Sequence, residues 1–593
     1  MWYKNLIDQE KVNAESIISN YVFNYMFILG INGWGNRSHD ASACLIENGK
    51  LISMVEEERF LRQKHAYDAL PINSTTFCLN NSKIGLDKID FVAIGWDLPK
   101  HYQSRGLNFP KTNKKIVKHL FPKNQFKYKK YPKVIFVPHH LAHAASSFFT
   151  SGFKDAAILV ADGQGEKQST SLFRAKNNKI KLIKEFPIKD SLGYFFEAAC
   201  KMVGLKTEDG GKIMGLASYG KTKIFNFDFI KLFPNGYSLG LKKDLLIKKN
   251  VDEQEEIIKQ WFKLWKNQFN ITPEPPKYYF NNKLIKREID FNNKNKNFAA
   301  STQKSLEKII LHLAKILKEK SGSKNIILSG GVALNCSSNG NILDSKIFKN
   351  MYIFPASTDS GVSLGAALYV DSIKNRNRKY KRIKSPYLGP AFSNKKIKKV
   401  LDKNKIKYRF YKNISRKVAK LLTQDKIVGW FQGKMEIGPR ALGNRSILAD
   451  PRYKKNHKIV NKIKGRENWR PLAPSILSSH KNNYFEKNIN SPFMLLAIKT
   501  NKKAEKEIPA VIHIDNTTRF QSVDNTNKKY YNLIKEFYKM TRVPVVLNTS
   551  FNLNNEPIVC TPEDAIKTFY SSPLDCLAIG NFIINKLYEK RNR

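Results

Sequence analysis

Short runs of apolar residues recur along the chain, bounded by segments rich in glycine, asparagine and lysine. Apolar runs between turn-forming segments predict β-strands. The predicted strands are Tyr21–Ile31, Ala41–Ile46, Leu51–Val55, Phe91–Ile94, Val134–Val137, Ala156–Val160, Asn325–Leu328, Met351–Phe354, Val545–Leu547 and Cys576–Ile579. Asn48-Gly49 lies between two of them and predicts a tight hairpin turn. Several strands run into glycine turns and helical segments, which predicts an α/β fold.

A basic segment with few apolar residues, 374–386, interrupts this pattern and closes with Ser385-Pro386. This composition is typical of a linker between domains. We therefore predict an N-terminal domain over residues 25–373 and a C-terminal domain over residues 387–593. Residues 1–24 are interpreted as an N-terminal extension. The sequence shows no internal repeat.

The chain of 593 residues carries 103 lysine and arginine residues against 50 aspartate and glutamate residues, a formal net charge of +53. Clustered cations bind nucleic acids by releasing counterions. The lysines are spread along the chain, however, and this favours a general compositional bias over a nucleic-acid-binding tract. The same positive field would steer a small anionic substrate toward the protein.

The composition, with 41% hydrophobic and 26% charged residues, is that of a globular protein. No apolar run approaches the roughly 18 residues of a membrane helix, and no basic segment of the signal-peptide type precedes the first run. The six cysteines are scattered without a CxxC pair, which argues against a zinc ribbon or a disulfide framework. These features predict a soluble cytoplasmic protein.

Two histidines and two aspartates are candidate metal ligands. His139 and His143 are four residues apart in a predicted helix, so they share one helical face. Asp162 and Asp359 each follow a predicted strand, where α/β folds keep their sites. Two histidines with a carboxylate suit Fe(II), and zinc is also plausible. The alternatives are surface histidines and aspartates that cap helices or form Asx-turns.

Three further segments carry candidate binding residues. Gly330 and Gly331 form a strand-to-helix turn that leads to Asn335 and permits close approach to a nucleotide, although such a turn is also an ordinary helix entry. Lys212 follows a second glycine-containing loop, 208–211, that could reach a phosphate or a substrate hydroxyl. His39 lies beside the opening hairpin and is either a general base or a surface histidine next to an aspartate.

The second half of the chain concentrates cations in segments punctuated by glycine, proline and small residues. Arginine is well suited to bidentate phosphate recognition. Each arginine alone would more often be a surface ion-pair partner, but together they predict a polyanion site. The residues assigned to it are Arg440, Arg445, Lys464, Arg466, Arg470, Arg519, Asn548 and Ser550.

The order of these motifs resembles the O-carbamoyltransferase family that modifies antibiotics and nodulation factors. The resemblance extends from about residue 27 to residue 583 and is specific because the whole set recurs in one order. Its motifs are His39-Asp40-Ala41-Ser42, Glu57-Glu58-Arg59-Phe60, His139-His140-Leu141-Ala142-His143-Ala144, Asp162-Gly163, Lys212-Ile213-Met214-Gly215-Leu216-Ala217, Gly330-Gly331-Val332-Ala333-Leu334-Asn335, Asp359-Ser360-Gly361, Gly438-Pro439-Arg440-Ala441-Leu442-Gly443-Asn444-Arg445-Ser446 and Asn548-Thr549-Ser550-Phe551-Asn552.

The resemblance implies an actin-like ATPase (ASKHA) domain followed by a YrdC-like α/β domain. It implies that carbamoyl phosphate and ATP, with Mg²⁺, form carbamoyl adenylate in the second domain. A hydroxyl of a sugar-containing acceptor then attacks the carbamoyl carbon in the first domain. The resemblance assigns proton removal to His39, and Fe²⁺ or another divalent metal to the histidines and aspartates. Lys464, Arg519 and Ser550 would act in adenylate formation.

Two alternative functions remain at this point. One is a relative of the tRNA threonylcarbamoyl-transfer or hydrogenase-maturation enzymes, although the latter normally carry CxxC zinc motifs that this chain lacks. The other is a nucleic-acid-binding protein, prompted by the charge. The loop 208–211 departs from the family pattern near the acceptor, so the acceptor stays open. No membrane and no specific nucleic acid are expected as partners, and a homodimer is possible.

Overall fold

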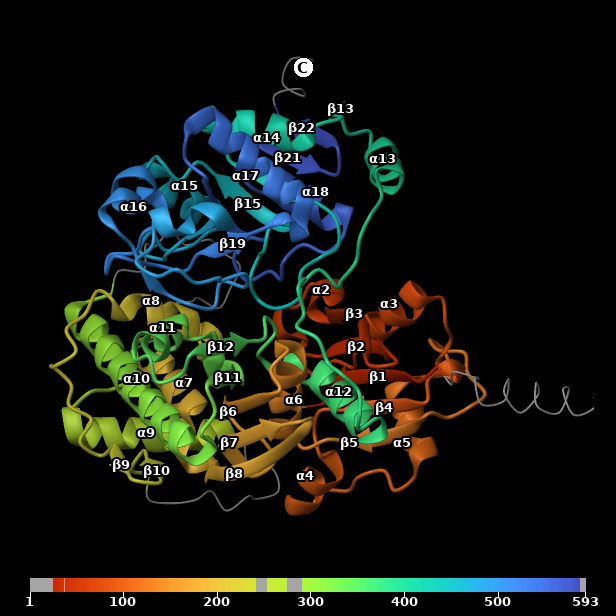
Figure 1. Ribbon diagram of the computed structural model, residues 1–593, viewed down its shortest axis with the longest axis vertical. Coiled ribbons are helices and arrows are strands. Elements are labelled where there is room, and N and C mark those ends of the chain that lie inside the picture. The colour runs from red at the N-terminus through yellow and green to blue at the C-terminus, as the bar shows by residue number, and fades with distance from the viewer. Residues whose placement is uncertain (1–24, 37, 242–252, 275–290, 587–593) are drawn as a thin grey trace, which may run out of the picture.

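The computed structural model describes residues 25–36, 38–241, 253–274 and 291–586. The N-terminal extension 1–24, and with it the first part of the predicted strand 21–31, lies outside the described residues. The α/β class is confirmed: sheets and helices alternate through both halves of the chain (Figure 1). Among the described residues, no helix has the length and apolar character needed to cross a bilayer.

The first sheet has five strands in the order β3-β2-β1-β4-β5. Strand β1 pairs antiparallel with β2 and parallel with β4. The predicted hairpin between β2 and β3 is confirmed, because Asn48 and Gly49 both have positive φ angles, of 48° and 74°. The strands are β1 (Phe27–Asn32), β2 (Ser42–Glu47), β3 (Lys50–Glu56), β4 (Phe91–Ile94) and β5 (Lys133–Phe136).

The second sheet repeats this topology in the order β8-β7-β6-β11-β12. Its earliest strand is again central, with an antiparallel hairpin on one side and two parallel strands on the other. A sheet duplicated in this way is the topology of the actin-like ATPase fold. The repeat is therefore structural, although none is visible in the sequence. The strands are β6 (Asp155–Ala161), β7 (Gln168–Lys176), β8 (Lys179–Pro187), β11 (Asn325–Ser329) and β12 (Asn350–Ile353).

Helices α6 (His139–Ser151) and α12 (Val362–Lys374) pack between the two sheets (Figure 1). Their backbones come so close that a Cβ atom added at Gly365 would lie 1.8 Å from the carbonyl oxygen of Ala142. At the other face of α12, a Cβ atom at Gly30 would lie 2.0 Å from the carbonyl oxygen of Ser363. Glycine thus sets the spacing between the helix that begins at His139 and the segment that follows Asp359.

Gly365→Ala is expected to destabilise the protein by about 1–3 kcal/mol, because the new methyl group forces α6 and α12 apart in a packed core. The measurement is chemical denaturation of both proteins. The matched control is Gly211→Ala in α8 (Gly210–Ala217), where an added Cβ atom meets nothing within 4 Å. Equal stabilities of Gly365→Ala and the wild type would contradict the close helix contact.

The remaining helices of the first half lie around the two sheets (Figure 1). Trp261 and Trp265 of α9 (Glu253–Phe269) are fully buried against α7 (Leu192–Met202) and α10 (Asn293–Ser321), so this helix contributes to the core. These helices are α2 (Glu58–Leu61), α3 (Ile72–Ser82), α4 (Leu98–Ser104), α5 (Asn113–Leu120), α7 (Leu192–Met202), α8 (Gly210–Ala217), α9 (Glu253–Phe269), α10 (Asn293–Ser321) and α11 (Cys336–Asp344). A small hairpin joins β9 (Lys231–Phe233) and β10 (Gly236–Ser238).

The second half is built on a mixed eight-stranded sheet in the order β13-β22-β21-β14-β15-β20-β16-β19. The strands are β13 (Arg409–Phe410), β14 (Val428–Phe431), β15 (Arg445–Ala449), β16 (Ala473–Leu477), β19 (Gln521–Val523), β20 (Val545–Ser550), β21 (Cys576–Ile579) and β22 (Phe582–Asn585), with β17 (Ile498–Lys499) and β18 (Thr517–Thr518) paired separately. The helices are α13 (Asn394–Lys403), α14 (Ile414–Thr423), α15 (Lys455–Ile463), α16 (Lys502–Glu507), α17 (Lys528–Thr541) and α18 (Pro562–Tyr570).

Much of the basic segment 374–386 lies against the first half of the molecule. The Arg378 guanidinium pairs with the buried carboxylate of Asp371 at 2.8 Å. Farther along, the backbone N–H of Ile383 donates to the carbonyl oxygen of Thr150 at 2.9 Å. Arg378, one of the basic residues that gave this segment the composition of a linker, thus attaches the segment to the first half. The domain boundary at this segment stays a prediction.

Candidate active site

The four candidate metal ligands converge in the first half of the molecule. His139 and His143 come from the first turns of α6, Asp162 follows β6, and Asp359 follows β12. The Nε2 atoms of the two histidines are 3.1 Å apart. The Nε2 atom of His143 lies 2.9 Å from Asp162 Oδ2 and 3.5 Å from Asp359 Oδ1. One ligand atom from each residue lies within 4.8 Å of all the others.

Surrounding groups orient these side chains toward one another. The Nδ1 atom of His139 is 3.0 Å from the carbonyl oxygen of Gly95, and the Trp96 ring stacks on its imidazole at 3.9 Å between centroids. This contact holds the ring with Nε2 facing the cluster. Asp162 Oδ1 accepts hydrogen bonds from the N–H groups of Gly163 and Gly331, so its other oxygen faces the histidines. The donor set of two imidazoles and two carboxylates fits a divalent transition-metal cation.

His39 lies at the more open side of this cluster. Its Nε2 atom is 3.9 Å from Asp359 Oδ2, and 51% of its side chain is exposed. Desolvation lowers the pKa of His39, but the charge of Asp40, 3.7 Å from its Nδ1 atom, and the charge of Asp359 outweigh it and raise the pKa to about 10. The carboxylates therefore favour the imidazolium form, and His39 accepts a proton readily only where a cation compensates their charge.

A second set of predicted residues lines one pocket where the two halves meet. Arg440, Arg466, Arg470 and Arg519 contribute to this pocket together with Asn548 and Ser550. The opposite wall comes from α8 and α11 of the first half, through Gly211, Met214, Gly215, Cys336 and Ser337. The pocket is thus assembled from both halves.

Four guanidinium groups in one pocket repel each other. Desolvation and then the charge of Arg519 lower the pKa of Arg440 to about 9. Desolvation and the charge of Arg470 likewise lower the pKa of Arg466 well below its ordinary value. A bound polyanion would relieve the repulsion among these guanidinium groups, because it compensates the positive charge that the pocket gathers. The arrangement is suited to a phosphate or polyphosphate ligand.

Lys464 lies behind the wall of this pocket and is fully buried. Its ammonium group donates hydrogen bonds to the backbone oxygens of Ser550 and Asn552 and to Asn552 Oδ1. Desolvation, followed by repulsion from Arg466 and Arg470, lowers the pKa of Lys464 well below its ordinary value. The side chain therefore fixes the turn that presents Ser550 to the pocket.

Several of the predicted binding residues do not line this pocket. Arg445 is fully buried and donates to the carbonyl oxygens of Gln432 and Pro390, while its guanidinium stacks over Phe431 at 3.8 Å. Arg445 therefore has a structural role within the second half, because strand β15 directs its side chain into the core. The sequence motif placed it beside Arg440, but the two side chains have different surroundings.

Asn335 and Lys212 are likewise engaged within the protein. The Asn335 amide exchanges hydrogen bonds with Gln303 and caps α11 by accepting from the N–H of Ser338. Lys212 pairs with Asp209 at 2.9 Å. Gly330 has a φ of +86°, and a Cβ atom there would lie 2.3 Å from the carbonyl oxygen of Ala161. Nucleotide binding by these residues and by Gly331 stays a prediction.

Sequence reasoning did not assign Glu166, Tyr67 or Glu197 to the site, and it included Glu208 only as part of the predicted loop 208–211. Glu166 Oε1 accepts from the N–H groups of Asp97 and His139, both at 2.9 Å, and so holds the start of α6. The Tyr67 hydroxyl donates to Glu208 Oε1 at 2.8 Å, which ties the predicted loop 208–211 to the segment near His39. These residues lie far apart in the chain, and no motif spacing connects them.

Glu197→Gln is expected to change how stability depends on pH. Burial raises the pKa of Glu197 from 4.5 to about 7. Between pH 4.5 and pH 7 the folded protein keeps the proton of Glu197, whereas the unfolded chain loses it. The stability that Glu197 contributes is therefore fully present below pH 4.5 and is lost as the pH rises to 7. The amide stays neutral, so the stability of the variant relative to the wild type should increase by on the order of 2–3 kcal/mol across this interval.

Denaturant titrations of both proteins at pH 5 and pH 8 measure this difference. Glu255→Gln, at an exposed glutamate of α9, is the matched control and should change little. A Glu197→Gln variant whose stability follows the wild-type pH profile would contradict the raised pKa of Glu197.

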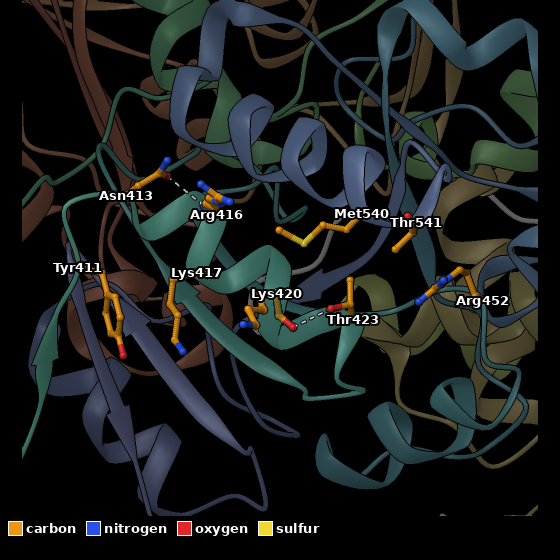
Figure 2. Close-up of a pocket in the computed structure, with 9 residues that line it drawn as sticks. All are labelled: Tyr411, Asn413, Arg416, Lys417, Lys420, Thr423, Arg452, Met540 and Thr541. Atoms are coloured by element: carbon orange, nitrogen blue, oxygen red, sulfur yellow. Dashed lines mark hydrogen bonds between the residues drawn. The ribbon is translucent and has the colours of Figure 1, made fainter.

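A second hollow lies on the surface of the second half, between α14 and the end of α17 (Figure 2). It gathers cations from Arg416, Lys417, Lys420 and Arg452 but no carboxylate or histidine. Figure 1 shows α14 on the side of this half that faces away from α8 and α11. The hollow is therefore separate from the pocket at the boundary between the halves, and its lining residues are all at least partly exposed.

Comparison with known proteins decides the family. Residues 28–368 match the family described as Carbamoyltransferase N-terminus, and residues 419–586 match Carbamoyltransferase C-terminus. The chain belongs to the carbamoyltransferase family. The expected resemblance is thus confirmed, and the protein is a carbamoyltransferase-family enzyme. Membership over both halves does not favour the nucleic-acid-binding or tRNA-modifying alternatives.

Relatives extend over nearly the whole carbamoyltransferase chain. It is 35% identical to an uncharacterised protein of Synechocystis sp., with 94% of this chain and 96% of that protein covered. It is 33% identical to nodulation protein NolNO of Sinorhizobium fredii, over 92% of this chain and 79% of that protein. Among solved structures, full-length HypF is similar at a TM-score of 0.30 and 13% identity, covering 59% of this chain and 56% of that one.

Proposed function

We propose that the protein is an ATP-dependent O-carbamoyltransferase that activates the carbamoyl group in the arginine pocket and transfers it at the histidine–aspartate cluster. The observation that carries this proposal is the pairing of the two sites in one carbamoyltransferase-family chain. One site gathers Arg440, Arg466, Arg470 and Arg519 around a space that α8 and α11 also line. The other gathers His139, His143, Asp162 and Asp359 within the first half.

In the first step, carbamoyl phosphate and ATP yield carbamoyl adenylate. Water releases phosphate from carbamoyl phosphate, and an oxygen of the resulting carbamate attacks the α-phosphorus of ATP and expels pyrophosphate. The charge on the phosphate oxygens grows at the leaving group, where fixed guanidinium groups stabilise it. Arg440, Arg466, Arg470 and Arg519 supply this stabilisation, Mg²⁺ accompanies ATP, and Lys464 and Ser550 keep the pocket wall in place.

In the second step, the hydroxyl oxygen of the acceptor attacks the carbamoyl carbon and AMP leaves. His39 takes the hydroxyl proton from the open side of the cluster. His139, His143, Asp359 and Asp162 would hold Fe²⁺ or another divalent cation, which supplies Lewis-acid stabilisation of the leaving phosphate. Transfer within the folded chain would keep the labile adenylate away from water.

The acceptor in this proposal is a hydroxyl of a sugar-containing metabolite. His39 is partly exposed, and Tyr67 and Glu208 lie on the segments around it, so aromatic and carboxylate groups that suit a polyhydroxyl compound stand near the proposed point of attack. We place the reaction in the cytoplasm, where ATP and carbamoyl phosphate are made and where the six free cysteines would stay reduced.

The test is incubation of the protein with ATP, carbamoyl phosphate, Mg²⁺ and Fe²⁺. Release of pyrophosphate that depends on carbamoyl phosphate supports the proposed first step, and ATP alone is the control. Pyrophosphate release that does not respond to carbamoyl phosphate would reject it. A screen of glycans and nucleosides for the mass of an added carbamoyl group then identifies the acceptor.

A further inference from the structure

The Glu57-Glu58-Arg59-Phe60 motif has no role in the chemistry described so far, yet it lies where the two halves touch. Arg59 and the preceding Glu56 are 3% and 4% exposed. Both contact the backbone of Gly438 in the second half: Gly438 donates its N–H to Glu56 Oε1 at 2.5 Å, and its carbonyl oxygen accepts from Arg59 at 2.8 Å. The buried ion pair of Glu56 and Arg59 thus clamps one residue of the opposite half.

Gly438 is also packed against the loop that leads to Asp359. A Cβ atom at Gly438 would lie 2.3 Å from the carbonyl oxygen of Pro355 and 3.2 Å from the N atom of Ala356. Its φ of +86° and this close approach both require glycine. Two residues later, Arg440 lines the arginine pocket. The turn that carries Arg440 therefore rests directly on the loop that carries Asp359.

The clamp also reaches the segment that carries His39. Arg59 contacts Glu58 Oε1 at 3.1 Å, and Glu58 Oε2 accepts from the N–H of His65 at 2.7 Å. The His65 ring in turn contacts Asp40 at 2.8 Å, next to His39. Hydrogen bonds and ion pairs thus run without a break from the Gly438 turn to the neighbour of His39.

Resting on the proposed function, we propose that Glu56 and Arg59 are positioning residues that lock the Gly438 turn onto the Asp359 loop and so couple the arginine pocket to the transfer site. Arg59 is suited to this role because its planar guanidinium serves the Gly438 carbonyl and two carboxylates at once. Anion binding at Arg440 then stiffens the Asp359 loop and aligns the two pockets for transfer.

Hydrogen exchange with and without pyrophosphate, the probe for the arginine pocket, tests this coupling in the full chain. In the wild type, pyrophosphate should slow exchange in peptides covering residues 436–442 and, by about fivefold or more, in peptides covering 355–361. In Arg59→Met, protection of 436–442 should remain while protection of 355–361 falls below about twofold. Glu56→Gln keeps an acceptor for Gly438 but loses the charge, so an intermediate effect is expected.

Arg62→Met is the matched control, because Arg62 also crosses to the second half but contacts Pro557 and Ile558 instead of Gly438. It should behave like the wild type. Arg59→Lys, which keeps a cation but not the planar fork, replaces Arg59→Met if the latter unfolds, and it should show the same selective loss. Protection of 355–361 that persists in the Arg59 variants would overturn the coupling alone. Absence of protection at 436–442 in the wild type would overturn the phosphate site, and both proposals with it.

Discussion

Replacing both His139 and His143 with alanine is expected to abolish carbamoyl transfer, by about a thousandfold or more, while pyrophosphate release changes only a few-fold. The two imidazoles supply half of the donor atoms in the cluster, and their Nε2 atoms lie 3.1 Å apart. Without them, the two carboxylates are left as a poorer site for a transition-metal cation. The arginine pocket is lined by other residues and should stay active.

Elemental analysis of bound metal gives a readout besides activity, and the double variant should bind iron or zinc at least about 100-fold more weakly. The matched control is His140→Asn on the same helix, because His140 is equally buried but its Nδ1 atom contacts Ser171 Oγ. A double variant that keeps both its metal and its transfer activity would show that the cluster is not the transfer site.

Lys464→Ala is expected to lower pyrophosphate release by about 100- to 1,000-fold. The buried ammonium group holds the oxygens of Ser550 and Asn552, so its removal leaves these acceptors without their donor and frees the turn behind the pocket. Initial rates of pyrophosphate release at saturating ATP and carbamoyl phosphate measure the effect.

Lys462→Ala is the control for this variant, because Lys462 lies in the last turn of α15, two residues before Lys464, but is exposed. Metal content should be unchanged in both variants, since the cluster lies in the first half. Ser550→Ala should lower pyrophosphate release as well. Normal pyrophosphate release in a folded Lys464→Ala protein would contradict the role of this pocket in activation.

The candidate metal cluster could be predicted from the sequence because its residues occupy positions that an α/β fold brings together. Asp162 and Asp359 follow strands of one sheet, and the carboxyl ends of parallel strands meet at one edge. His139 and His143 share a helical face whatever the surroundings are. The α/β class, the hairpin at Asn48-Gly49 and the strands near these residues follow from the same local patterns.

The direction of a side chain within a motif could not be predicted in the same way. Arg440 and Arg445 belong to one glycine-punctuated segment, but Arg440 lines the pocket while Arg445 begins β15 and is fully buried among carbonyl groups. The difference depends on where the strand starts and which face it presents. Residues 374–386 had the composition of a linker, yet Arg378 pairs with the buried Asp371.

By itself, the amino-acid order determined the fold class, the set of candidate ligands and, through its motifs, the family, because each depends on residues close in the chain or on a recurring set of them. Only the tertiary structure decided that the first half contains two sheets of the same topology, because many different sequences satisfy the same packing pattern. It also decided that Glu56 and Arg59 hold Gly438, which lies 382 and 379 positions farther along the chain. Contacts at such separations depend on how whole layers pack.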